Sequence, residues 1–272
     1  MGFDGVSPYR VEESLAFGDG LRSVSHRLMN RSLPAWLQIL ALAVSAAAQT
    51  PSGLPEAKPP APPAIREVSP GVFQVGGVKL EKEARRVSFP AKLNMTNGPL
   101  EYLLVTTAGK THESVLTTDI EAQHLQVAML LLGAKGMSAA ALTNAPAGGP
   151  ITQGALRNPP LPGDAVVIEV TWTQGGKPQQ RRLEELVFNK RAKEPMTKGE
   201  FTFTGSRLWQ GKFIAQTEGS IIALVTDPDA VFNNPRPNRD AEDTWLVREA
   251  EVPPQDTVVE VSVTLVPAGK GK

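Results

Sequence analysis

Short β-favouring runs joined by glycine turns are the feature that most limits how this chain can fold. The run over residues 72–95 is interrupted at Gly76-Gly77 and again in the charged segment 81–86. Two later pairs of runs meet at Gly175-Gly176 and at Gln210-Gly211. Closely spaced runs of this kind predict strands joined by tight turns, because glycine supplies the positive φ that such turns need.

Two further segments predict strands that differ in burial. Residues 221–225 form a continuous apolar run, which is typical of a strand covered on both faces. Residues 257–266 alternate valine and leucine with polar side chains, which predicts a half-buried strand. The amphipathic segment 183–188 fits either a helix or a strand.

Residues 100–118 predict a hairpin with one functional candidate on it. Two β-rich arms flank Ala108-Gly109-Lys110, where glycine permits a tight connection. On this interpretation His112 lies early in the returning strand.

One helix is predicted over about 118–132. Thr118 and Glu121 fit a capping box, and Gly133 is a suitable stop. The apolar residues of 125–132 lie all round the helix, which favours burial of most of its surface. The predicted fold class is therefore α+β: a single domain with a predominantly antiparallel β-sheet packed around one main buried helix.

The first seventy residues predict export. Residues 29–48 read as a secretory signal, with Arg31 in the positive region, a short apolar core, and small residues before a cleavage that leaves Gln49 first. The apolar core is shorter than the roughly 20 residues of a membrane helix, so we expect no stable membrane span after cleavage.

The remaining boundaries follow from composition. Residues 1–28 are polar and unlike the front of a signal, so we expect translation to start at Met29 and residues 1–28 to be a non-native extension. Residues 49–70 are a proline-rich linker, 71–267 the globular domain and 268–272 a tail. Within the domain, the Ala/Gly/Pro-rich segment 134–163 is either a functional lid or a disordered insert.

Composition excludes several chemistries. The chain has no cysteine, which removes disulfides, iron–sulfur clusters, thiolate zinc sites and cysteine nucleophiles. Lys plus Arg and Asp plus Glu each number 28, so no net field favours nucleic acid. Gly109-Lys110-Thr111 is not a nucleotide-binding P-loop, because Leu104 stands where the motif needs glycine. No cofactor is predicted.

The candidate catalytic residues are His112, Glu113 and His124. His112-Glu113 begins like a zinc-protease motif, but Leu116 occupies the position of its second histidine. A zinc site would have to recruit a carboxylate to the two histidines. The competing interpretation places His124 at the edge of the core, satisfied by its neighbours.

The densest polar cluster follows the buried strand and is the candidate binding loop. The polar cluster contains Asp227, Asp229, Asn233, Asn234, Arg236, Arg239, Asp240, Glu242 and Asp243, and all of these except Glu242 are the candidate binding residues. Three interpretations remain open: a loop ordered by Asp–Arg pairs and Asx turns, a ligand or partner surface, and a calcium site. For calcium, the candidate ligands are Asp227, Asp229 and Asp240, although the EF-hand spacing is absent.

Four blocks of the sequence are similar to the YdjY-domain family. They span residues 76–95, 100–119, 124–136 and 219–245, so the resemblance covers nearly all of the globular region. It implies an exported bacterial domain, periplasmic or extracellular, whose biochemical role is uncharacterised. Some relatives have carried iron–sulfur labels, which the absence of cysteine does not support here.

Two functions therefore compete. In the first, the domain is a noncatalytic binding or cell-envelope module, whose partner is an envelope component or ligand yet to be identified. In the second, it is a hydrolase-like or metal-dependent enzyme that uses His112 and Glu113 with the acidic loop 227–243. The enzyme hypothesis requires these side chains to line one cleft, because a general base must reach its substrate.

Overall fold

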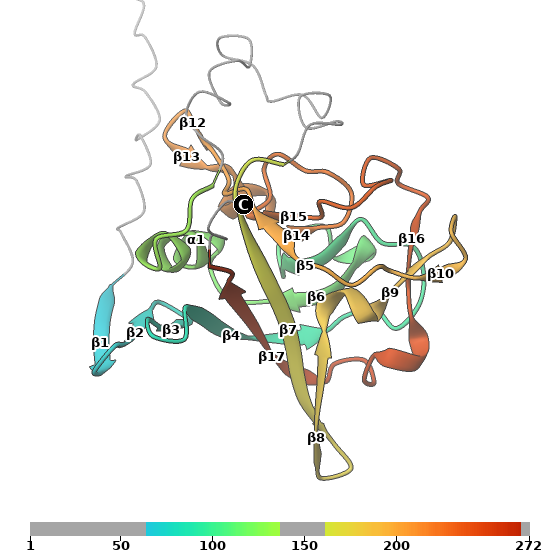
Figure 1. Ribbon diagram of the computed structural model, residues 1–272, viewed down its shortest axis with the longest axis horizontal. Helices are drawn as coiled ribbons and strands as arrows, with labels where there is room; N and C mark the ends of the chain where they lie inside the picture. The colour runs from blue at the N-terminus through green and yellow to red at the C-terminus, as the bar shows by residue number, and fades with distance from the viewer. Residues whose placement is uncertain (1–63, 137–160, 268–272) are drawn as a thin grey trace, which may run out of the picture. The chain divides into compact units, whose positions relative to one another are not determined.

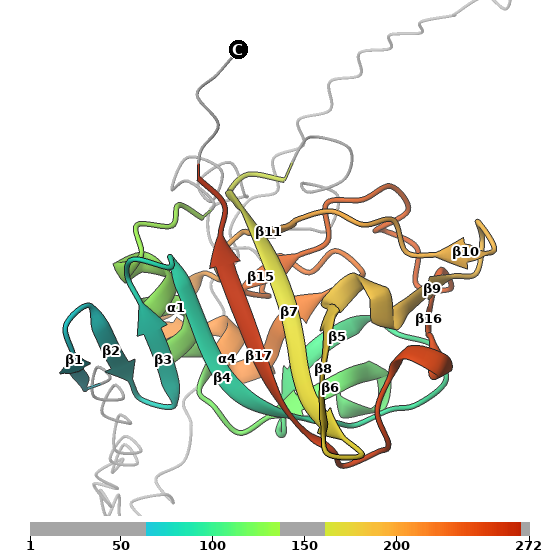
Figure 2. The same ribbon diagram turned by 60° about the horizontal axis from the view of Figure 1, so that its bottom comes forward.

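The computed structural model describes residues 64–136 and 161–267, and eight strands of this part close into a β-barrel (Figures 1 and 2). Around the barrel these strands are β4 (Arg86–Leu93), β17 (Val258–Leu265), β7 (Asp164–Gln174), β11 (Phe201–Phe203), β15 (Phe232–Asn233), β14 (Ser220–Ala223), β5 (Tyr102–Thr106) and β6 (Ser114–Thr118). β6 pairs with β4 and closes the ring. The barrel is mixed, because β14–β15 and β5–β6 are parallel pairs.

The sheet continues beyond the barrel on both sides. β3 (Val78–Glu81), β2 (Val72–Val75) and β1 (Ile65–Ser69) extend it from β4, while β8 (Lys177–Arg182) extends it from β7. Two small sheets complete the β-structure: β10 (Glu194–Pro195), β9 (Val187–Asn189) and β16 (Trp245–Val247) form one, and β12 (Leu208–Trp209) and β13 (Lys212–Phe213) the other. The described residues all belong to one compact unit.

Two short α-helices occur in the described residues, α1 (Ala122–Leu131) and α4 (Ile214–Glu218). Short 3-10 turns cover Thr111–Glu113, Leu183–Leu186 and Glu249–Glu251. The segment 183–188, which fits helix or strand, is thus a 3-10 turn that leads into β9.

The expectation of one central buried helix is corrected. α1 lies beside the β2–β3 hairpin and α4 (Figure 2). It buries only the face that carries Ala122, Leu125, Ala128 and Met129. Leu130 and Leu131 remain 52% and 43% exposed. Apolar side chains all round a helix do not ensure burial, because a folded protein leaves much apolar surface exposed.

The predicted capping box is also wrong, whereas the predicted stop is confirmed. Thr118 is the last residue of β6, three residues before the helix N-cap; its hydroxyl donates to the Pro90 carbonyl at 2.6 Å and accepts the Ile120 amide, which precedes the helix. The helix begins after Glu121, whose side chain makes no capping bond. At the other end Gly133 adopts φ +81°, and the Gly133 and Ala134 amides bond back to Leu130 and Met129 in a Schellman motif.

Most predicted turns and both strand burial patterns are confirmed. Gly76, Gly175, Gly176 and Gly211 all have positive φ at the turns between β2 and β3, β7 and β8, and β12 and β13. β14 is buried at all four positions, and β17 alternates buried and more exposed residues. Local turn chemistry and side-chain periodicity therefore carry over into the fold.

The predicted hairpin over residues 100–118 is wrong. β5 and β6 are parallel, with Tyr102 opposite Ser114 and Thr106 opposite Thr118. Residues 107–113 run back along β5 and place His112 in the 3-10 turn ahead of β6. β6 is instead antiparallel to β4, a partner from an earlier part of the chain.

The proposed signal segment, most of the proline-rich linker, the tail and most of segment 134–163 lie outside the described residues.

Candidate functional site: an acidic cleft

A cleft of about 500 Å³ opens beside the start of β5. It is lined by His112 and Glu113 from the 3-10 turn and by Asp227 and Asp229 from the loop after β14. Sequence-predicted candidates that are more than a hundred residues apart in the chain therefore line one cleft. Six carboxylate side chains line it in all: Glu101, Glu113, Glu218, Asp227, Asp229 and Glu242.

The parallel β5–β6 pair brings two glutamates together. Tyr102 stands opposite Ser114, so Glu101 and Glu113 precede the two strands side by side. The Glu101 amide donates to the Glu113 carbonyl at 3.0 Å, which holds this alignment. The Glu101 carbonyl in turn accepts the Leu224 and Val225 amides and so joins the strand ends to the acidic loop.

The two glutamates repel each other, and a lysine partly offsets the repulsion. Burial raises the pKa of Glu101, and the nearby Glu113 carboxylate raises it further. Lys110 lowers the pKa of Glu101, because its ammonium lies 3.7 Å from the Glu101 carboxylate. The same ammonium lies 3.6 Å from the Glu113 carboxylate. His112 is 78% exposed and lies 3.8 Å from Glu113, at the mouth of the cleft.

Tyr102 and Asp227 form the inner wall. The Tyr102 hydroxyl donates to the Asp227 carboxylate at 2.9 Å. Burial, together with the charge of Asp227, raises the pKa of Tyr102, so this hydroxyl keeps its proton at neutral pH. Asp229 is paired with Arg207, and the hydrogen bond to Asp229 raises the pKa of that guanidinium.

The buried members of the predicted binding loop hold the loop in place. Asn233 exchanges hydrogen bonds with the backbone of Asp227, and Asn234 donates to the Leu224 carbonyl. Arg236 donates to the carbonyls of Thr197, Gly199 and Glu200 and packs its guanidinium on the Phe201 ring. These three side chains do not line the cleft.

The remaining loop candidates also lie outside the cleft lining. Asp240 accepts a hydrogen bond from Thr226 at 2.9 Å, and Arg239 donates to the Pro235 carbonyl. Asp243 pairs with Arg191 on the surface, and this hydrogen bond lowers the pKa of Asp243. Asp–Arg pairs and an Asx turn, in which the Asp229 amide donates to Asp227, are thus present in the loop.

His124 lies away from this cleft. It projects from α1 into a separate pocket and lies 3.6 Å from Glu121. The two histidines therefore do not form a joint site, and only His112 adjoins the acidic cleft.

The described residues contain no side-chain group arranged as a metal centre. Across residues 64–136 and 161–267, no three His, Cys, Asp or Glu side chains are grouped as a metal would require. Of the calcium candidates, Asp227 and Asp229 line the cleft but are held by Tyr102 and Arg207, while Asp240 lies outside it.

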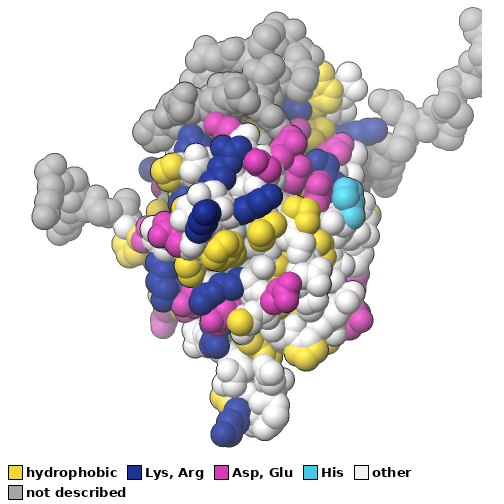
Figure 3. All heavy atoms as spheres, turned by 90° about the vertical axis from the view of Figure 1, so that its right-hand side faces the viewer, with side chains coloured by type: hydrophobic (Ala, Val, Ile, Leu, Met, Phe, Trp, Pro, Cys, Tyr) yellow, Lys and Arg dark blue, Asp and Glu magenta, His cyan; other side chains and the backbone are white. Residues whose placement is uncertain are grey.

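Several residues that line the cleft were not predicted from the sequence as site residues, among them Glu101, Tyr102, Lys110 and Glu218. Glu101 was missed because an antiparallel hairpin would have placed it far from Glu113. The only local signal was the polar Glu101 just before the apolar run of β5. On the face shown in Figure 3, acidic and basic side chains are interspersed, and a histidine adjoins acidic side chains.

These features define a class of protein: a small mixed β-barrel with an acidic surface cleft at the ends of its parallel strands. The chain belongs to the YdjY-domain family, whose domain matches residues 78–264. No curated protein and no solved structure shows significant similarity to the chain. No helix in the described parts of the chain is long and apolar enough to cross a membrane.

Proposed function

We propose that this chain is an exported, noncatalytic binding module whose acidic cleft takes a cationic group, an amine or guanidinium carried by an envelope component or small ligand. The observation that carries the proposal is the charge around the cleft: six carboxylates face one lysine and one histidine. A cleft with an excess of one sign of charge concentrates ligands of the opposite sign.

The position of Lys110 supports an ammonium as the group that binds. Its Nζ lies between Glu101 and Glu113 and 5.3 Å from the centre of the Tyr102 ring. Two carboxylates and an aromatic face are the groups that attract a cation. The Lys110 side chain is half exposed, so a ligand cation can join it or displace it.

Export is supported by the segment at residues 29–48, which combines a positive start, a short apolar core and a small-residue cleavage site. An exported module would meet cationic groups on envelope polymers and peptides.

The test is calorimetric titration of the protein with spermidine at low and high salt. We expect saturable binding that weakens as salt rises, because exposed charge pairs are screened. Glu113→Gln should weaken binding about fivefold, whereas Glu83→Gln, in the exposed turn between β3 and β4, should leave it unchanged. Equal affinity in the two variants would refute the proposal. Tighter binding of calcium than of spermidine would favour the calcium interpretation of Asp227 and Asp229 instead.

One observation favours a second candidate, a hydrolase-like enzyme. The pKa of Glu101 is raised by burial and by the neighbouring Glu113, and Glu113 in turn lies 3.8 Å from His112; paired groups of this kind can act as acid and base. The purified protein should then hydrolyse a chromogenic ester or glycoside, and both Glu101→Gln and Glu113→Gln should abolish turnover. If the unaltered protein shows no turnover of these substrates, while Glu113→Gln still loses spermidine binding, the enzyme candidate is ruled out for those substrates.

A further inference from the structure

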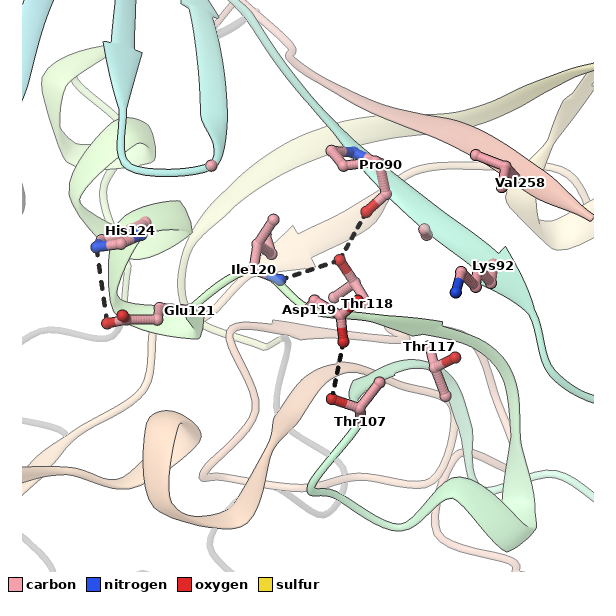
Figure 4. Close-up of a pocket in the computed structure, with 12 residues that line it drawn as sticks. Pro90, Lys92, Thr107, Thr117, Thr118, Asp119, Ile120, Glu121, His124 and Val258 are labelled. Carbon is pink, nitrogen blue, oxygen red and sulfur yellow. Dashed lines mark hydrogen bonds and ion pairs between the residues drawn. The ribbon is translucent and has the colours of Figure 1, made fainter. Parts of the chain in front are cut away.

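A second pocket, of about 290 Å³, lies on the outer face of the barrel and shares no lining residue with the acidic cleft (Figure 4). Its floor is formed by β17, β4 and β6 where they meet. Its wall is formed by residues 119–121, by His124 of α1 and by Gly77 in the β2–β3 turn.

The floor carries an ordered row of three side chains. Val258 stands opposite Lys92 in the β17–β4 ladder, and Lys92 stands opposite Thr117 in the β4–β6 ladder. Residues directly opposite in antiparallel strands project from the same face, about 5 Å apart. An apolar side chain, an ammonium and a hydroxyl therefore lie side by side along the pocket.

The side chains of Lys92 and Thr117 have no polar partner among the residues that the structure describes. No ion pair or side-chain hydrogen bond involves either residue, and Figure 4 shows none. Thr117 is only 9% exposed. The Thr117 hydroxyl is not among the buried polar atoms that lack a partner, so it reaches the open space of the pocket, where a ligand atom can accept its hydrogen.

The rest of the pocket lining is mainly apolar, and the Pro90 carbonyl in it already has a hydrogen-bond donor. Pro90 brings no amide hydrogen to the edge of β4 that faces β6, and its carbonyl there accepts the Thr118 hydroxyl. Ile120, Ala91 and Val258 supply aliphatic surface. A pocket of this size, with an apolar body and a few polar groups, fits a small molecule.

The acidic side chains at the rim are already engaged. Asp119 accepts a hydrogen bond from Thr107 at 3.0 Å, and Glu121 lies 3.6 Å from His124 (Figure 4). Lys92 is the charged side chain of the pocket lining for which the structure records no ion pair or side-chain hydrogen bond. An ammonium beside a hydroxyl donor suits a carboxylate, whose oxygens accept from both.

We propose that this pocket binds a small amphipathic carboxylate, with its carboxylate on Lys92 and Thr117 and its apolar body against Pro90, Ile120 and Val258. This site is independent of the cation-binding function proposed for the acidic cleft.

The test is an NMR titration of the ¹⁵N-labelled protein with octanoate, followed at the amides of Thr117, Ile120 and His124. Octanol and octylamine are titrated in parallel, because they keep the apolar chain and change only the head group. We expect saturable shifts at these amides with a Kd of about 1 mM or tighter for octanoate, and at least about tenfold weaker binding of the other two.

Matched variants separate the ammonium from the hydroxyl. Lys92→Met should weaken octanoate binding about tenfold or more, while Lys190→Met, a lysine outside the pocket, should not change it. Thr117→Val should weaken it several-fold, and Thr117→Ser should retain it, because serine keeps the hydroxyl. The proposal is overturned if octanoate gives no saturable shift at these amides, if octanol or octylamine binds as tightly, or if Lys92→Met matches the Lys190→Met control.

Discussion

At the scale of single residues, Glu101 has the electrostatic environment with the clearest consequence for stability. Its folded pKa is raised, so its protonated form is favoured in the folded state. The stability that this contributes is fully present below the unfolded pKa, near 4.3, and is lost as pH rises through the raised folded pKa.

Glu101→Gln imitates the protonated side chain at every pH. We therefore expect the variant to be more stable than the unaltered protein at pH 7, by about 0.5 kcal/mol, and the difference to shrink as pH falls toward about 4. Urea unfolding at the two pH values measures this. A variant that is less stable at pH 7 would show that the bridge to Lys110 outweighs the repulsion from Glu113.

Two arginine–carboxylate pairs differ in burial and should differ in energy. Arg236 is 9% exposed and donates to three backbone carbonyls, and it lies 3.9 Å from Glu184, which is fully buried. Arg236→Met should cost about 2–4 kcal/mol, because it leaves three backbone carbonyls without this donor, while Glu184 keeps Arg182, whose Nε lies 2.6 Å away.

The matched control is Arg191→Met. Arg191 pairs with Asp243 on the surface, where both side chains are at least half exposed, so its loss should change the free energy of unfolding little. Thermal or urea unfolding of both variants tests the comparison. If both variants lose little unfolding free energy, Arg236 is not a structural residue, and ligand binding again becomes a candidate role for it.

At the scale of elements, the β2–β3 turn is fitted against α1. Gly76 has φ +55°, and a Cβ there would lie 2.0 Å from the His124 ring. Gly175, in the β7–β8 turn, has φ +57° with open space around it. Gly175→Ala should therefore cost about 1 kcal/mol for the left-handed backbone alone, and Gly76→Ala clearly more.

The steric part of the Gly76→Ala cost depends on His124. Adding His124→Ala to Gly76→Ala should recover part of the lost stability, and urea unfolding of the four proteins in this cycle measures the coupling. Additive effects of the two substitutions would mean that the turn does not pack on the ring.

The elements that could be predicted from sequence are those whose causes are local. Three such features depend on neighbouring residues and were predicted: the helix stop at Gly133, the turn at Gly175-Gly176 and the alternating burial of β17. Thr118 was misplaced because the chain is still a strand at this position: Thr118 pairs with Thr106 of β5, and the helix begins only after Glu121. Glu101 could not be predicted as a site residue for a similar reason, because only the parallel pairing of β5 with β6 brings it close to Glu113.

At the scale of the whole molecule, the barrel depends on its last strand. β17 lies between β4 and β7 and pairs with both along most of its length. It also contributes Val259, Val261, Val263 and Leu265 to the core. No pattern near any one strand encodes this order, because it joins segments from the two ends of the globular region.

A chain that ends at Asp256 should therefore fail to fold. Each buried valine or leucine contributes about 1.5–3 kcal/mol, and a typical domain has only about 5–15 kcal/mol of stability in total. A chain that begins at Gly71 should fold, because β1 is exposed at all five positions and pairs only with β2. Far-UV circular dichroism and the dispersion of ¹H–¹⁵N spectra distinguish the two truncations. A folded chain without β17 would show that the other strands keep the fold without it, and would contradict the dependence argued here.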